Sequence, residues 1–198
     1  MSNGQRTVIA ALQVSLDGYV EAPEGDARDW VDSWADALEL LGPVDAFVLG
    51  RGMFDGRYEA WWDAALADPD TASAMFGRAP YPREVEYARR AHETPHIVLS
   101  KTMTESEWPN VRIARDIDEI AALKREPGNA VYVVGGPGLM ATLMNAGLID
   151  ELRLILQPVI LGGGMPLFGG VGQRHPLELV AAAAGPGGRV DLTYRVLR

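Results

Sequence analysis

The sequence predicts an α/β fold in which a mixed, mostly parallel central sheet has helices on both faces. Short apolar runs of strand length alternate with segments of helical periodicity along the chain. One such run, residues 131–134, leads through a double glycine directly into the start of a helix. Near the C-terminus, two strand-like segments are separated by Gly-Pro-Gly-Gly, a pattern typical of an antiparallel hairpin. We therefore expect a three-layer domain that covers residues 1–198 and is closed by an antiparallel pair.

Periodicity and turn residues assign the individual elements. The expected strands are at residues 7–14, 45–49, 96–99, 111–113, 131–134, 151–156, 177–183 and 189–197. The expected helices are at residues 31–41, 83–92 and 116–125, with a further helix that follows the double glycine and ends at Gly147. Residues 15–30 and 52–82 are rich in turn residues and are expected to be loops, the second with one helical piece.

Composition excludes several classes of function. The 198 residues are 47% hydrophobic and carry 18 basic against 27 acidic side chains, a net charge of −9. This balance argues against a general nucleic-acid or anionic-membrane binder, since either needs a basic face. The chain has no cysteine and no apolar run of the roughly 20 residues that span a bilayer. We expect a cytoplasmic protein that binds a small molecule, without nucleic-acid or membrane partners.

The glycine turn after residues 131–134 is the strongest candidate for a binding site. Gly135 and Gly136 allow a tight turn and a close backbone approach to a ligand, and Pro137 suits the first turn of a helix. A helix N-terminus placed in this way favours a phosphate group. The letters G-P-G-L-M-A match the dinucleotide-binding fingerprint, but no acidic residue lies between Glu151 and Glu178 to hold a ribose. We therefore reject a Rossmann site.

Two other strand ends carry groups that could join this turn. Gly50 and Arg51 follow the strand at residues 45–49, and Ser100 and Lys101 follow the strand at residues 96–99. In an open α/β sheet, ligands lie beyond the carboxyl ends of the strands. A guanidinium, an ammonium and a hydroxyl at that edge could converge with the glycine turn on one phosphorylated ligand. The alternative is that both cations are ordinary solvated surface residues.

Together these segments resemble the dihydrofolate-reductase-like superfamily, and most closely the C-terminal reductase domain of RibD in riboflavin biosynthesis. The resemblance runs nearly from end to end. It is carried by VSLDGYVEAPEGDARDW, DAFVLGRGMF and HIVLSKT, and above all by VYVVGGPGLMATLMNAGLIDELRLILQPVILGGGMPLF. It implies a mixed sheet flanked by helices, NADPH as the hydride donor and a homodimer.

The resemblance also implies roles for individual residues. The GR turn and the following strand end would hold the adenosine 2′-phosphate through Gly50, Arg51, Ser100 and Lys101. The diphosphate would lie against Gly135, Gly136, Pro137, Gly138 and Leu139. Met53 occupies a position where many relatives have threonine, so that a backbone contact to the cofactor survives the change but a hydroxyl contact does not. The residues from Ser15 to Gly18 would border the nicotinamide and the substrate.

The expected proton donor is Asp17 or an ordered water, although Asp-Gly is also a common turn pair. Dihydrofolate reductases use a carboxylate on the first helix. Asp32 and Asp36 lie in the segment expected to form that helix, but they fall away from its apolar stripe of tryptophan and leucine. We therefore expect both aspartates to face solvent. No histidine spacing indicates a metal site, and His96, at the start of a strand, is expected to be structural.

Aromatic and glycine-rich segments supply the expected substrate contacts. Tyr58, Trp61 and Trp62 are the candidates for stacking on a planar ring, with local packing as the alternative, and Trp34 is a further expected substrate contact. Gly163, inside a run of three glycines, is a candidate for close backbone approach to a substrate or a partner subunit, with a simple turn as the alternative.

We expect an NADPH-dependent reductase that passes hydride to a C=N or C=O carbon of a (ribosylamino)pyrimidine- or pteridine-like substrate. A stand-alone reductase of the same fold is the broader expectation. The alternatives are a dihydrofolate-reductase-like enzyme that acts on another small substrate and a module that binds NADPH without turnover.

Overall fold

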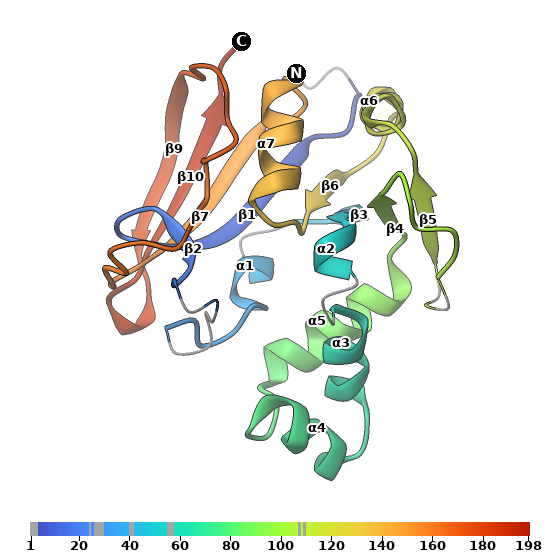
Figure 1. Cartoon of the computed structure of the whole chain (residues 1–198), viewed down its shortest axis with the longest axis vertical. Helices are drawn as coiled ribbons and strands as arrows, with labels where there is room; N and C mark the ends of the chain where they lie inside the picture. Colours follow the sequence, from blue (N-terminus) through green and yellow to red (C-terminus); the bar gives the residue numbers. More distant parts are fainter. Residues whose placement is uncertain are drawn as a thin grey trace.

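A computed structural model describes residues 4–23, 25, 30–39, 42–54, 58–106, 108 and 110–198. Its centre is an eight-stranded sheet of order β5-β4-β3-β6-β1-β7-β10-β9 (Figure 1). The strands in chain order are β1 (Val8–Ser15), β3 (Val44–Gly50), β4 (His96–Leu99), β5 (Val111–Ala114), β6 (Ala130–Val133), β7 (Glu151–Gln157), β9 (Leu177–Ala184) and β10 (Val190–Val196). Within this sheet, as far as its strands are described, only the pairings of β10 with β7 and β9 are antiparallel. The predicted mixed sheet with a C-terminal hairpin is confirmed.

Helices cover both faces of this sheet, which makes three layers (Figure 1). They are α1 (Asp36–Glu39), α2 (Arg51–Met53), α3 (Glu59–Leu66), α4 (Pro69–Phe76), α5 (Pro82–Glu93), α6 (Ile117–Arg125) and α7 (Pro137–Asn145). Alternation along β3 shows how the layers form, because successive side chains point to opposite faces. Ala46 and Val48 belong to the core under α6 and α7, whereas Phe47 and Leu49 belong to the aromatic core under α3 and α5.

The route of the chain places a switch point next to β1. From β1 the chain crosses to β3 and builds β4 and β5 outward, then returns with β6 between β3 and β1, and continues with β7 on the other side of β1. Ligands of open α/β sheets bind at the carboxyl ends of strands where the order reverses in this way. The carboxyl ends of β3, β6 and β1 are therefore the expected location of a site.

Two predicted elements are wrong. Within residues 31–39, the described part of the helix expected at residues 31–41, only Asp36–Glu39 is helical, and residues 40 and 41 lie outside the described residues. The segment 52–82 holds two eight-residue helices, α3 and α4, instead of one helical piece. Asp68 starts α4 by accepting hydrogen bonds from the amides of Asp70 and Thr71, and Gly77 ends it with φ 71°.

The prediction also missed a small two-stranded sheet that joins the region after β1 to the run of three glycines. It consists of β2 (Tyr19–Glu21) and β8 (Met165–Pro166). Gly164 makes this pairing possible, since it has φ +114° and a Cβ there would overlap the carbonyl oxygen of Glu21. The close approach that these glycines allow is therefore to the chain's own backbone.

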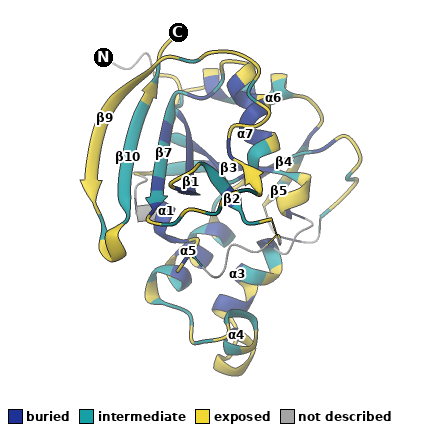
Figure 2. Cartoon of the chain, turned by 60° about the vertical axis from the view of Figure 1, so that its left-hand side comes forward, coloured by how far each residue is buried: buried dark blue, intermediate teal, exposed yellow. Residues whose placement is uncertain are grey.

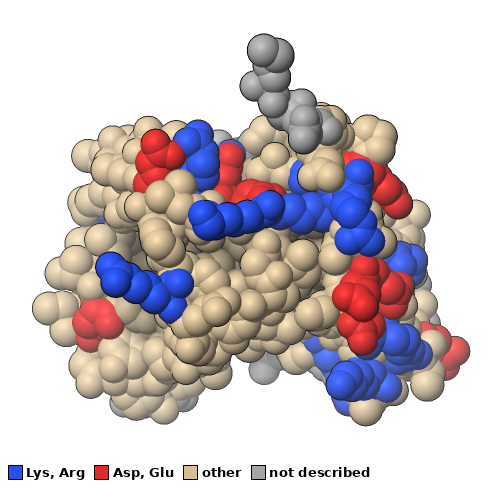
Figure 3. Space-filling model, turned by 90° about the horizontal axis from the view of Figure 1, so that it is seen from above, with Lys and Arg blue, Asp and Glu red and all other residues tan. Residues whose placement is uncertain are grey.

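The surface differs from one side of the molecule to another. Strand β9, at the edge of the sheet, is exposed along its whole length (Figure 2). On the face drawn in Figure 3, basic side chains lie among acidic ones and broad uncharged areas, without forming one continuous basic surface. None of the described helices is long and apolar enough to cross a membrane.

Candidate functional site

Three neighbouring parallel strands end at the same edge of the sheet. The register pairs Gly50 with Leu99, so that Arg51 and Ser100 leave β3 and β4 side by side. Val48 pairs with Val133, and the amide of the next residue, Val134, donates to the carbonyl of Val48 at 2.9 Å. The three strand ends singled out in the sequence are therefore brought together. They form what we call the phosphate edge: Gly50, Arg51, Ser100, Lys101 and the turn from Gly135 to Leu139.

The cationic half of the phosphate edge is held by side chain–backbone bonds. The Ser100 hydroxyl accepts from the amides of Thr102 at 3.3 Å and Met103 at 3.0 Å, which fixes the turn that carries the exposed Lys101. Arg51 is also exposed, and its guanidinium donates to the hydroxyl of Thr102. These bonds hold a guanidinium and an ammonium on adjacent strand ends. They give the edge local positive charge in an acidic chain.

The other half of the phosphate edge is the N-terminus of α7. Gly136 is the N-cap, with φ −72° and ψ 177° and no side-chain cap, and Pro137 occupies the first turn. The amides of a first helical turn have no partner within the helix and favour an anion. A Cβ on Gly135 would lie 2.5 Å from Cδ2 of Leu139, so this glycine lets the Leu139 side chain pack beneath the turn. Leu139 is 7% exposed and thus offers a ligand its backbone rather than its side chain.

These groups fit a pyridine dinucleotide carrying a 2′-phosphate. Backbone amides at a helix start suit the diphosphate, and the cations of Arg51 and Lys101 suit a second, separate phosphate. Met53, which follows on α2, is 38% exposed at the same edge.

A cleft of about 420 Å³ adjoins the glycine turn. We call it the aromatic cleft, because six of its lining residues are tryptophans or tyrosines. It is lined by Ala11, Leu12, Gln13, Val20, Glu21, Gly25, Trp34, Ala37, Met53, Tyr58, Trp61, Trp62, Tyr87, Tyr132, Val134, Gly135, Gly136 and Pro137. Since Gly135, Gly136 and Pro137 belong to both, the phosphate edge and the aromatic cleft are continuous.

Beneath the cleft, a hydrogen-bond chain runs in one direction. Nδ1 of His96 lies 2.9 Å from the carbonyl oxygen of Thr94, which can only accept, so Nδ1 carries the proton and Nε2 is an acceptor. Tyr58 lies 3.1 Å from Nε2 and must donate to it. Its oxygen, 3.0 Å from that of Tyr87, then accepts from Tyr87. The chain therefore runs from Tyr87 through Tyr58 and His96 to Thr94.

Burial keeps this chain uncharged. The lack of solvent around His96 lowers its pKa to about 4, an effect that outweighs the hydrogen bond to Thr94, so the ring is neutral near pH 7. Burial likewise raises the pKa of Tyr58 and of Tyr87 above the ordinary tyrosine range, so neither is an acid near neutrality. The expectation that His96 is structural is consistent with this position.

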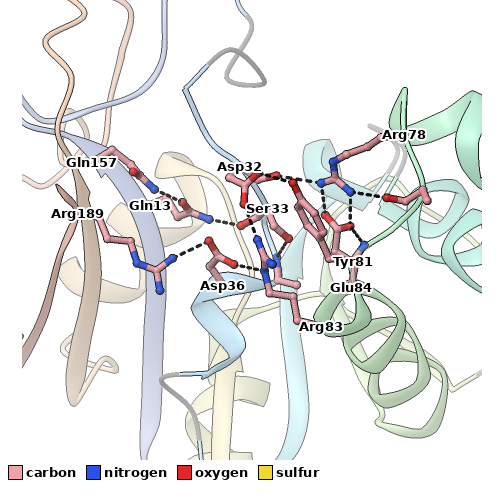
Figure 4. Close-up of polar contacts among 12 residues, drawn as sticks. Gln13, Asp32, Ser33, Asp36, Arg78, Tyr81, Arg83, Glu84, Gln157 and Arg189 are labelled. Atoms are coloured by element: carbon pink, nitrogen blue, oxygen red, sulfur yellow. Dashed lines mark hydrogen bonds and ion pairs between the residues drawn. The ribbon is translucent and has the colours of Figure 1, made fainter. Parts of the chain in front are cut away.

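The remaining polar groups of the cleft are also engaged with the protein. Tyr132 donates to the carbonyl of Ala11 at 3.0 Å. The amide of Gln13 donates to the carbonyl of Ser33 at 2.5 Å and accepts from Gln157 at 2.6 Å (Figure 4). Nε1 of Trp61 has no partner among the described residues, but it is enclosed.

Asp36 is buried, which corrects the expectation that it faces solvent. Its side chain is 6% exposed and lies between two guanidinium groups, those of Arg83 at 2.5 Å and Arg189 at 2.6 Å (Figure 4). Arg189 lies in the hairpin between β9 and β10, so its ion pair with Asp36 links α1 to the sheet. Asp32 does face solvent, as expected, with a side chain 62% exposed that contacts Arg83 and Tyr81.

Four of the residues predicted for catalysis or substrate binding lie outside the cleft lining. Asp17 accepts from the Ser15 hydroxyl at 2.7 Å and from the amides of Leu161 and Gly162 at 3.1 and 2.7 Å. Asp17 is exposed; local desolvation raises the pKa of its carboxyl, but these hydrogen bonds outweigh that effect and the net shift is downward. Asp17 therefore acts as the acceptor of a turn, which is the alternative considered from the sequence, and it is poorly suited to donate a proton.

Ser15, Gly18 and Gly163 belong to the same turn region. Ser15 is fully buried and its hydroxyl accepts from the Tyr19 amide at 2.9 Å. Gly18 has φ +91° and accepts from the Leu167 amide, while Gly163 lies against Pro23. These residues connect β1, β2 and β8 and do not border the cleft. By contrast, the predicted substrate contacts Trp34 and Trp61 both line it.

Sequence reasoning missed several lining residues, notably Gln13, Glu21, Tyr87 and Tyr132. Gln13 carried a usable signal, since it is a polar residue inside the apolar strand β1 and is 1% exposed. Tyr87 and Tyr132 carried none, because a tyrosine on a helix or strand is usually a core residue.

The chain is similar to known proteins over nearly its whole length. The profile of the RibD C-terminal domain matches residues 6–188. The Bacillus subtilis protein YyaP, itself uncharacterised, is 34% identical over 195 residues, which cover 96% of this chain and 95% of YyaP.

Solved structures share the fold. A protein named for riboflavin biosynthesis from Shewanella sp. PV-4 superposes with a TM-score of 0.68 at 23% identity, over 97% of this chain and 99% of that one. Dihydrofolate reductase from Enterococcus faecalis, in a complex with NADP(H), superposes with a TM-score of 0.57 at 18% identity, over 98% of each chain.

Proposed function

Because the chain belongs to the RibD C-terminal domain family, we propose that it is an NADPH-dependent reductase of a small planar substrate. One observation carries the proposal. Three adjacent parallel strands deliver Arg51, the Ser100–Lys101 pair and the α7 N-terminus to one edge, next to a cleft lined by aromatic rings. This arrangement offers separate sites for two phosphate groups and a ring-binding space beside them.

In this proposal each residue has a positional task. Arg51 and Lys101 bind the 2′-phosphate, the Ser100 hydroxyl holds the turn that carries Lys101, and the first-turn amides of α7 bind the diphosphate. The bound cofactor supplies a hydride. Trp34 and Trp61 flank the substrate ring in the aromatic cleft.

The cleft and the family both support the proposed substrate class. A planar heterocycle with a C=N or C=O acceptor carbon, of the (ribosylamino)pyrimidine or pteridine type, suits an aromatic lining. Asp36, on the first helix, is already held by two arginines and has no free carboxylate oxygen to offer a pterin. This favours a stand-alone reductase of another small substrate over a dihydrofolate reductase.

The cofactor assignment is tested with Arg51→Ala. Losing a charge-assisted contact to the 2′-phosphate should weaken NADPH binding by about 1.5–3 kcal/mol and leave NADH binding nearly unchanged. Isothermal titration with both cofactors measures this. Arg112→Ala, on β5 beyond the phosphate edge, is the matched control. An equal loss for NADPH and NADH in Arg51→Ala would refute the assignment.

Turnover separates an enzyme from a module that only binds NADPH. The full chain, incubated with NADPH and a panel of pteridines, ribosylaminopyrimidines, imines and small carbonyls, should consume NADPH absorbance with at least one of them. Tight NADPH binding without consumption across the panel would favour the binding module.

We also propose that the chain acts as a cytoplasmic homodimer. Strand β9 presents Leu177, Leu179 and Val180, which are 41%, 55% and 51% exposed. An exposed apolar edge strand of this kind is usually paired or covered. Leu179→Lys should convert the dimer to a monomer in sedimentation equilibrium, whereas Leu66→Lys on α3 should not. A monomeric parent protein would contradict the dimer. A cysteine-free chain is consistent with a reducing compartment, which cell fractionation would test.

A further inference from the structure

We infer that the natural acceptor carbon belongs to a cationic C=N⁺ group, an iminium or an N-alkylated heteroaromatic ring. This inference rests on the proposed reductase function and narrows its substrate class. It depends on three properties of the aromatic cleft: where its hydroxyl protons are directed, which charges line it, and what a hydride acceptor needs from its surroundings.

The hydroxyl protons of the cleft are directed into the protein. The chain from Tyr87 through Tyr58 to His96 uses two of them, because Nδ1 of His96 is committed to Thr94. The Tyr132 hydroxyl donates its hydrogen bond to the Ala11 carbonyl. What these residues present to a ligand is therefore ring faces and oxygen lone pairs, which are electron-rich.

Acid groups near the cleft do not supply a proton either. Asp17 lies outside the lining and is an acceptor of three hydrogen bonds that lower its pKa. The N–H of Trp61 is enclosed and so is not offered to a ligand. Among the described lining residues other than the Glu21 carboxylate, none is poised to protonate the oxygen of a carbonyl or the nitrogen of a neutral imine.

The cleft lining carries a negative charge, which would attract a cation. Glu21, on β2, is the one charged side chain among the described residues that line the cleft. A carboxylate beside several aromatic faces is the pattern that binds organic cations, since the ring quadrupole and the carboxylate both attract positive charge. The cations of the phosphate edge, Arg51 and Lys101, are not part of this lining.

A cationic acceptor removes the need for a proton donor. The iminium carbon forms a C–H bond with the hydride from the reduced nicotinamide dinucleotide, and the C=N π pair moves onto nitrogen. The nitrogen loses its positive charge, the substrate is reduced to a neutral amine, and the dinucleotide is oxidised. No proton enters or leaves. A neutral C=O or C=N acceptor would need one proton, for which these lining residues have no donor.

Binding of matched probes tests the charge preference without turnover. The cation 2-methylisoquinolinium and the neutral 2-methylnaphthalene have the same shape, and 2-naphthoate supplies a negative charge. Equilibrium dialysis against the full chain without cofactor should give the cation roughly tenfold or more tighter binding than the neutral ring, and the anion the weakest. Equal binding of cation and neutral ring, or tighter binding of the anion, would overturn the inference.

The role of Glu21 is tested in the same assay. Glu21→Gln should reduce the preference for the cation severalfold and leave binding of 2-methylnaphthalene unchanged. Glu93→Gln, which removes an exposed carboxylate at the end of α5, should leave both unchanged. An unchanged cation preference in Glu21→Gln would contradict the assignment of Glu21.

Turnover distinguishes failure of this inference from failure of the reductase proposal. With NADPH, 2-methyl-3,4-dihydroisoquinolinium should be reduced at a rate that does not fall between pH 6 and pH 8, since no proton is consumed. If NADPH binds with the expected dependence on Arg51 and only uncharged acceptors are reduced, the enzyme proposal stands and the cationic acceptor is refuted. If NADPH does not bind, the reductase proposal fails, while the probe-binding result still decides the charge preference of the cleft.

Discussion

Acidification should destabilise the folded protein through His96, the residue that fixes the direction of the hydrogen-bond chain under the cleft. His96 is 0% exposed, and burial lowers its folded pKa from the ordinary histidine value of 6.5 to about 4. Between these two values the unfolded chain binds a proton that the folded chain does not. The free energy of unfolding must therefore rise with pH across this window and fall as the pH drops through it.

The size of the effect follows from the shift. One pKa unit corresponds to about 1.36 kcal/mol, so a shift from 6.5 to about 4 corresponds to about 3 kcal/mol in total. The contribution of neutral His96 to the free energy of unfolding is nearly complete above pH 7. About 2 kcal/mol of it should be lost on going from pH 7 to pH 5. Urea unfolding followed by tryptophan fluorescence at several pH values in this range measures it.

The variant His96→Gln isolates this contribution from that of other groups. It should lower stability at pH 7, since the Tyr58 hydroxyl loses its acceptor, but it should also remove about 2 kcal/mol of the pH dependence between pH 7 and pH 5. His175→Gln, at a histidine that is not part of this hydrogen-bond chain, should keep the pH dependence of stability seen in the parent protein. If the free energy of unfolding changes with pH equally in His96→Gln and in the parent protein, then His96 is not held neutral, and the direction deduced for the hydrogen bonds is wrong.

Two further pairs of variants test the phosphate edge and the packing of α1. Gly135→Ala should cost about 1–3 kcal/mol of stability, because the new methyl group meets Leu139. Gly136→Ala should leave stability nearly unchanged, since nothing lies within 4 Å of its added Cβ. Both variants should weaken NADPH binding, and thermal unfolding with and without NADPH separates the effect on stability from the effect on binding. Asp36→Asn should cost about 3 kcal/mol in urea unfolding by leaving two arginines without their buried partner, whereas Asp32→Asn, at an exposed carboxylate, should cost less than about 1 kcal/mol. Similar losses for the two aspartate variants would contradict the buried network.

The phosphate edge was predictable from the sequence because its parts are local. A strand that ends in Gly50 or in Gly135 carries its own turn signal, and parallel strands place their carboxyl ends at one edge whatever their order. The two short strands β2 and β8 were not predictable in this way. They are only three and two residues long, and their pairing depends on the close approach of Gly164 to a segment far away in the sequence.

The lining of the cleft was harder to predict because its chemistry depends on partners distant in sequence. Tyr58 and His96 are 38 residues apart, and Gln13 and Gln157 are 144 apart. A tyrosine hydroxyl is both a donor and an acceptor until its partner is known. Which of these residues could give a proton to a ligand was therefore settled only when the fold placed the Thr94 carbonyl next to His96.

Asp36 shows most directly why a role does not transfer by position alone. A carboxylate on the first helix matches the place of the substrate-binding acid in dihydrofolate reductases, yet here Arg83 and Arg189 occupy both of its oxygens. Arg189 lies 153 residues further along the chain, on the hairpin that closes the sheet. With Asp36 held by two arginines, and with Glu21 as the charged side chain among the described lining residues, the cleft suits the cationic acceptor that we propose.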